Sequence, residues 1–180
     1  MFCRAAAALL VLLTGCGGRG PARTVERIAL VHLDNLSPSA ENQWLSVAVP
    51  AAVAVSLSSS PSQFAFVASS TNEGHVGRAT RFVRGYLTGE GSRLTAHLSE
   101  FDARSGKAVA RWEVTGESAS QLGTAIARRL WPQAPALAPE LPPDPQAALR
   151  DLSGRLSSNV PAAEAGNLAR QRPADSRLAA

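Results

Sequence analysis

The sequence predicts an α/β fold, with a small mixed sheet and helices packed mainly on one of its faces. Residues 28–33 form a continuous apolar run, typical of a strand that is covered on both sides. Three later segments alternate apolar and polar residues between turn residues, as in an antiparallel meander of three strands. Elsewhere, apolar residues recur at helical spacing. With 180 residues, 45% of them hydrophobic, the chain suits one domain with tails.

The amino-terminal residues predict export and lipid attachment. Arg4 and the apolar run Ala5–Leu13 form a short signal-peptide pattern. The tetrapeptide Leu13–Cys16, which reads Leu-Thr-Gly-Cys, resembles the lipobox of bacterial lipoproteins. The resemblance implies that the signal peptide, residues 1–15, is removed and that Cys16 is lipidated. The alternative is a soluble secreted protein with an accidental cysteine near an ordinary cleavage site.

A lipid anchor at Cys16 implies a location for the mature chain. One acyl chain binds a membrane weakly and two or more bind it stably, so a triacylated cysteine would hold the protein firmly. Gly17 stands where an aspartate favours the inner membrane in enteric bacteria, so by analogy we expect the periplasmic leaflet of the outer membrane. Because Cys3 leaves with the signal peptide, no free thiol remains for catalysis or for a disulfide.

A tether and the first strand follow the cysteine. Residues 16–24 are rich in glycine, which predicts a flexible tether, and residues 25–131 are expected to form the folded domain. At the end of the first strand, Asp34, Asn35 and Ser37 are expected to cap a turn, because their short polar side chains bond to nearby backbone.

A helix and a second strand are predicted next. Apolar residues at helical spacing predict a helix over Glu41–Ser59. Pro50 lies inside this range and suits a first helical turn, so we expect a kink or a fresh start there. A short apolar segment, Gln63–Ala68, is expected to form the second strand.

The meander is predicted from Arg81–Thr88, Arg93–Phe101 and Lys107–Thr115, and a helix is expected from Glu117 to Leu130. Alternation places the side chains of the three strands on two faces. The face expected to be buried carries Val83, Leu87, Leu94, Ala96, Leu98, Ala110, Trp112 and Val114. The face expected to be exposed carries Arg84, Tyr86, Thr88, Arg93, Thr95, His97, Arg111 and Glu113.

Residues 132–180 are predicted to be a proline- and alanine-rich linker with a weakly helical, largely disordered tail. Six prolines stand within residues 132–145, a composition that favours an extended chain without a core. One amphipathic helix is predicted over Pro145–Leu156 and a weaker one over Ala162–Arg170. We expect the whole tail to add nothing to the core of the domain.

An ordered series of motifs in residues 25–131 resembles the family of bacterial domains similar to the amino-terminal domain of TolB. Arg27–Pro38 with Glu41–Leu45 resembles the family's first strand and the Asn-Leu-Ser loop that leads into a helix. The family's later strands are matched by Phe82–Leu87, Leu94–Phe101 and Ser105–Trp112.

The resemblance implies a non-catalytic domain of the kind that accompanies tetratricopeptide repeats or cell-envelope modules. Two features depart from the family pattern. His32 and Leu33 stand where the family has Pro-Phe, and the helix between the second and third strands is reduced to Ser69–Thr80, which lacks apolar periodicity. Loss of that helix is expected to leave one face or edge of the sheet less covered.

Candidate catalytic and metal-binding groups are few in the sequence. His32, His75 and His97 have no partners at metal-ligand spacing, so we expect no metal and no cofactor. His32, Asp34 and Ser37 lie within six residues of one strand end, whereas a catalytic triad needs groups from separate segments. We therefore expect no enzymatic activity and no small-molecule substrate.

The net charge of +4 comes almost entirely from arginine. Since export is expected and the arginines are scattered along the chain, we do not expect nucleic-acid binding. Contact with anionic lipid headgroups or cell-wall polymer stays open as an alternative to a simple preference for arginine.

The exposed face of the meander is the candidate interaction surface. Arginine and tyrosine are favoured where proteins bind each other, and the alternative is an ordinary solvated sheet face. The residues we expect to make contacts are Arg84, Tyr86, His97 and Arg111.

The function expected is that of a non-catalytic envelope lipoprotein, with a periplasm-facing scaffold or accessory domain that binds another protein. The alternative is a lipoprotein regulator of an envelope enzyme such as a cell-wall synthase. Activators of that class are similar in having a small α/β domain and a proline-rich tether. In them the tether precedes the domain, whereas here the proline-rich stretch follows it.

Overall fold

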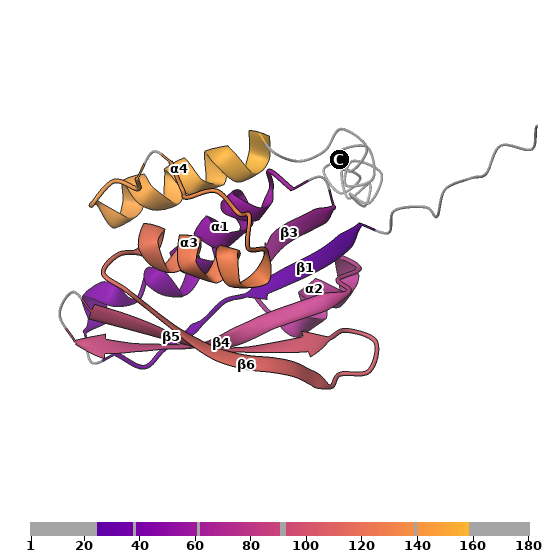
Figure 1. Ribbon diagram of the computed structural model, residues 1–180. Coiled ribbons are helices and arrows are strands. Elements are labelled where there is room, and N and C mark those ends of the chain that lie inside the picture. The colour runs from indigo at the N-terminus through magenta and orange to yellow at the C-terminus, as the bar shows by residue number, and fades with distance from the viewer. Residues whose placement is uncertain (1–24, 38, 61, 91–92, 139, 159–180) are drawn as a thin grey trace, which may run out of the picture.

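A computed structural model of the chain (Figure 1) describes residues 25–37, 39–60, 62–90, 93–138 and 140–158. The predicted signal peptide, lipobox, tether and second tail helix lie outside these residues. Within them, no helix is long and apolar enough to cross a membrane. The elements are β1 (Glu26–Val31), β2 (Asp34–Asn35), the 3-10 helix η1 (Ala40–Asn42), α1 (Leu45–Leu57), β3 (Gln63–Ala68), α2 (Thr71–Val76), β4 (Arg81–Glu90), β5 (Arg93–Asp102), β6 (Ala108–Gly116), α3 (Ala119–Leu130) and α4 (Pro145–Ser158).

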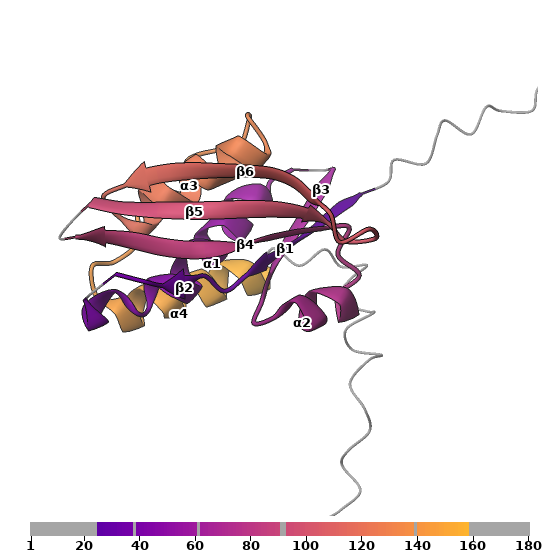
Figure 2. The ribbon, with the colours of Figure 1, turned by 90° about the horizontal axis from the view of Figure 1, so that it is seen from below.

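The sheet is mixed, with the strand order β3-β1-β4-β5-β6 and with β2 paired to β4. β1 runs parallel to β3 and to β4, while β4, β5 and β6 form the predicted antiparallel meander. α1 supplies the crossover that the parallel neighbours β1 and β3 require. Three helices, α1, α3 and α4, cover one face, and α2 lies on the other (Figures 1 and 2). The predicted fold class is confirmed.

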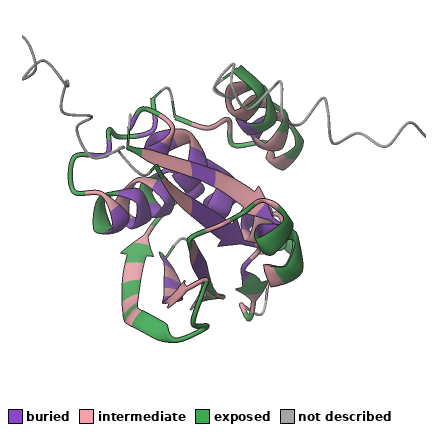
Figure 3. Cartoon of the chain, turned by 90° about the vertical axis from the view of Figure 1, so that its right-hand side faces the viewer, coloured by how far each residue is buried: buried purple, intermediate pink, exposed green. Residues whose placement is uncertain are grey.

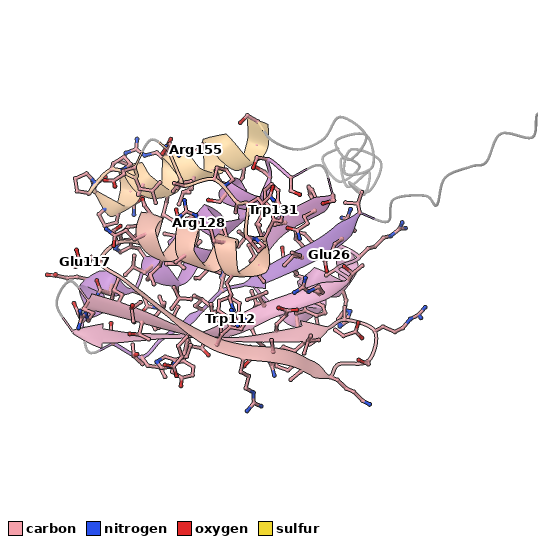
Figure 4. The ribbon with its side chains drawn as sticks, viewed as in Figure 1. Glu26, Trp112, Glu117, Arg128, Trp131 and Arg155 are labelled. Atoms are coloured by element: carbon pink, nitrogen blue, oxygen red, sulfur yellow. The ribbon has the colours of Figure 1, made fainter. Side chains whose placement is uncertain are left out.

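The main core lies between the sheet and the helices α1, α3 and α4. The alternation predicted for the meander is confirmed, since its inner side chains in β4 and β5 are buried. Those of β6 are half-buried because β6 is the last strand of the sheet. Trp112 points from β6 toward the helix layer, where it packs on the core (Figure 4).

The opposite face of the sheet is covered beside β1. Four side chains are buried there under the six-residue helix α2: Ala29, Val31, Ala68 and Phe82. Gly74 allows this packing, because a Cβ at Gly74 would stand 2.3 Å from a ring carbon of Phe82. The reduced helix expected between the second and third strands therefore covers one end of this face. Beyond it, Arg84, Tyr86 and Arg111 are exposed, as predicted.

The structure corrects two expectations about the turn and the helix after β1. Of the residues expected to cap the turn, Asn35 does so, since its Oδ1 accepts the Ser37 N–H at 3.0 Å. Asp34 instead pairs with β4 as part of β2.

The helix predicted from Glu41 begins four residues later, after the 3-10 turn, and α1 continues through Pro50 without a fresh start. Proline has no N–H for the carbonyl four residues earlier. That carbonyl, of Ser46, accepts the Leu33 N–H at 3.0 Å instead. The Ser46 carbonyl, which has no partner N–H at Pro50, thus connects α1 to the segment after β1.

The expectation that the tail adds nothing to the core is wrong for residues 132–158. Ala134, Leu137, Ala148 and Leu152 are buried, and α4 packs on α1. The predicted helix over Pro145–Leu156 is present as α4. The physical reason is that its apolar face finds a partner in α1, which helical periodicity alone does not reveal.

Candidate interaction surface

A hollow of about 770 Å³ lies on the sheet face that α1, α3 and α4 leave uncovered. Its floor consists of outward side chains of β4, β5 and β6, and its wall is made by the segment after β1 and the start of α2. The structure brings all four predicted contact residues together in this hollow: Arg84, Tyr86, His97 and Arg111.

Strand register arranges the floor in two neighbouring rows. Arg84, Ser99 and Arg111 lie opposite one another across β4, β5 and β6. The adjacent row holds Tyr86, His97 and Glu113. Since neighbouring strands lie about 4.8 Å apart, the two arginines stand about 10 Å apart at the backbone, on either side of Ser99.

Tyr86 and His97 form a stacked pair at the centre of the hollow. Their ring centroids are 4.6 Å apart and the rings are inclined by 15°. Directly opposed residues on antiparallel strands favour such contacts. Tyr86 keeps 39% of its surface exposed, so the stack presents an aromatic surface to solvent.

His97 is held by hydrogen bonds at both ring nitrogens. Its Nδ1 lies 2.9 Å from Glu113 Oε1, and its Nε2 lies 3.0 Å from Thr88 Oγ1. A neutral ring would donate from Nδ1 to the carboxylate and accept the threonine hydroxyl at Nε2. The alternation of the strands predicts Thr88 and Glu113 on the exposed face, but the sequence does not indicate that they are hydrogen-bond partners of His97.

Thr88, His97 and Glu113 are hydrogen-bonded in the same sequence as the nucleophile, base and orienting acid of a catalytic triad. Acyl transfer also needs donors aimed at an oxyanion, usually free backbone N–H groups. Here the three side chains come from the adjacent strands β4, β5 and β6, and the hydrogen bonds hold His97 at both ring nitrogens. The arrangement therefore fixes the orientation of the imidazole.

The arginines of the floor are available to a partner. The Arg84 guanidinium lies over the Phe101 ring at 4.4 Å, which orients it without using its N–H groups. Within the described residues, neither Arg84 nor Arg111 makes a hydrogen bond or an ion pair, and both are exposed. A guanidinium group whose N–H groups are unpaired can donate two parallel hydrogen bonds to the two oxygens of a carboxylate.

The wall of the hollow is polar and begins at α2. The Ser69 hydroxyl and N–H donate to Glu73 Oε2 at 2.6 and 2.7 Å. These bonds, with a smaller effect of His32, hold the pKa of Glu73 below its ordinary value. His32 and Asp34 line the hollow and Ser37 does not, so the structure does not assemble these three as a triad. Within the described ranges, no cluster of potential ligands fits a metal ion.

Solved structures similar to this chain are distant. The chain is 18% identical to PelC from Paraburkholderia phytofirmans, solved as a dodecamer, with a TM-score of 0.46 over 66% of this chain and 94% of PelC. It is 16% identical to the lipoprotein GNA1162 from Neisseria meningitidis, with a TM-score of 0.40 over 58% of this chain and 95% of that one. For TolB from Acinetobacter baumannii the identity is 10% and the TM-score 0.43, over 60% of this chain and 28% of TolB.

No protein-family model matches the sequence, and no curated protein matches it significantly. TolB is among the similar structures, and membership of its family stays a prediction. At these identities and TM-scores, the similarities carry no conclusion about function.

Proposed function

We propose that the protein is a lipid-anchored component of the bacterial cell envelope whose domain binds an acidic segment of another protein and performs no chemistry of its own. The anchor is inferred from the lipobox Leu13–Cys16, and Gly17 favours the outer membrane. Binding is assigned to the hollow on the open sheet face.

One observation carries the binding proposal. Two exposed guanidinium groups, those of Arg84 and Arg111, lie in one cross-strand row beside the Tyr86–His97 stack. Such a row matches a peptide that offers two carboxylates and an apolar or aromatic side chain between or beside them. The Glu113 carboxylate is engaged by His97, which reduces its repulsion of an acidic partner.

The test is a comparison of partner capture by two arginine variants. The lipidated protein is cross-linked in its own membranes, isolated, and the co-isolated proteins are quantified. Arg84→Glu is expected to lower recovery of the specific partner at least tenfold. Arg93→Glu is the matched control, because Arg93 is exposed on the same face and does not line the hollow.

Thermal unfolding of each variant checks that the fold is intact, since exposed substitutions change stability by about 0.5 kcal/mol or less. Raising the salt concentration should weaken capture by the wild type, because exposed ion pairs are screened. Equal recovery by both variants would place the binding site elsewhere on the molecule.

A further inference from the structure

β6 ends the sheet with an edge that none of the described strands pairs. In the strand order β3-β1-β4-β5-β6, β6 pairs only with β5. None of its nine residues is buried (Figure 3). A free edge of this length is a template for the addition of another strand.

Only part of β6 is regular enough to pair. The register between β5 and β6 shifts at Glu100 and Phe101, which places an irregularity beside Val109. Irregularities of this kind twist an edge away from new partners. The regular ladder runs from Ala110 to Gly116.

Arg111 and Glu113 flank Trp112 on β6 with opposite charges, so two copies of this strand can be complementary to each other. When two copies of a strand pair antiparallel about a two-fold axis, each residue lies opposite the one equally far from the centre. A centre at Trp112 places Arg111 of each copy opposite Glu113 of the other, so two opposite-charge pairs form. Ala110 then faces Val114 on the helix side.

Neighbouring registers are disfavoured by the same charges. A centre at Arg111 would place two arginines directly opposite each other, and a centre at Glu113 would oppose two glutamates. Like charges in that position destabilise a ladder, and opposite charges stabilise it. Arg111 is exposed and the Glu113 side chain keeps 68% of its surface exposed, so pairing across the edge would not require the core to rearrange.

We propose that two copies of this chain pair through β6, in the register centred at Trp112, and so extend the sheet from one copy into the other. The dimer shares Arg111 and Glu113 with the lining of the hollow, whereas Arg84 belongs to the hollow and not to β6, so the Arg84 variant tests partner binding without altering the dimer edge. Because the regular pairing region is short, the dimer is expected to be reversible and to weaken at high salt.

Charge reversal tests both the dimer and its register. The full mature chain is used with Cys16→Ser, so that lipid does not itself cause association, and the dimer dissociation constant is measured by sedimentation equilibrium. Arg111→Glu and Glu113→Arg are each expected to raise that constant at least tenfold, because each converts two attractive pairs into two repulsive ones. The double variant, with both changes, should return it to within about threefold of the wild-type value.

Two controls keep the outcome unambiguous. Arg104→Glu reverses an exposed charge in the turn between β5 and β6 and should leave the constant unchanged. An equimolar mixture of the two single variants should form mixed dimers, which also demonstrates that each variant is folded. A wild-type chain that stays monomeric, or a double variant as weak as the single ones, would overturn the proposal.

Discussion

At Gly123 the absence of a side chain determines how closely α3 lies on α1. A Cβ at Gly123 would stand 2.5 Å from the Cβ of Ala52, closer than carbon atoms approach. Gly154 in α4 is the opposite case, because a Cβ there would meet nothing within 4 Å. Gly123 is therefore needed for close helix packing, whereas Gly154 only lowers the helix propensity of α4.

We expect Gly123→Ala to lower the free energy of unfolding by about 1–2 kcal/mol, because overpacking outweighs the gain in helix propensity. Gly154→Ala should raise it, by up to about 1 kcal/mol, since only the propensity changes. Urea unfolding followed by circular dichroism measures both. Changes of the same sign would contradict the close approach of α3 and α1.

At the same scale, alternation alone placed Arg84, Tyr86, His97 and Arg111 on one face, and the structure agrees. The pairing of Tyr86 with His97, and of His97 with Glu113, did not follow from the sequence. Those contacts depend on register between strands, which the turns and the irregularity near Val109 determine. Whether the four residues bind a partner stays a prediction.

At the scale of elements, residues 132–138 and 140–158 belong to the folded body. The amides of Leu137 and Leu141 donate to hydroxyls of α3, Thr124 Oγ1 and Ser120 Oγ, at 3.1 Å each. These bonds dock an extended, proline-rich segment that forms few backbone bonds of its own. Composition predicted that the segment is extended, but not that it is held in place. The helix that begins at Pro145 could be predicted because its apolar residues recur at helical spacing within the segment itself.

Leu152 tests the contribution of α4. It is 1% exposed and belongs to the main core, whereas Ser153 beside it is exposed. We expect Leu152→Ala to lower the free energy of unfolding by about 2–5 kcal/mol through lost burial and a cavity. Ser153→Ala should change it by about 0.5 kcal/mol or less. Thermal unfolding measures both, and a Leu152→Ala chain as stable as the Ser153→Ala chain would mean that α4 does not pack on α1.

At the scale of the whole molecule, β1 separates the expected anchor from the hollow. The tether precedes Glu26, at the amino end of β1, while Val31 and His32 at its other end line the hollow. Six residues of strand span about 20 Å. A nine-residue tether, residues 16–24, would add roughly 17 Å of flexible reach. A domain held in this way is able to present its hollow away from the membrane.

Two cysteine variants test the anchor that this arrangement assumes. Cys16→Ser removes the predicted lipid acceptor, so the protein should lose labelled palmitate and move from the membrane fraction to the soluble fraction. Cys3→Ser is the matched control and should stay lipidated, because Cys3 lies in the predicted signal peptide. Since β1 begins ten residues after Cys16, neither change should alter unfolding of the domain. Retention of the Cys16→Ser chain on membranes that resist a high-salt wash would refute the lipid anchor, because electrostatic attachment is screened by salt whereas acyl chains are not.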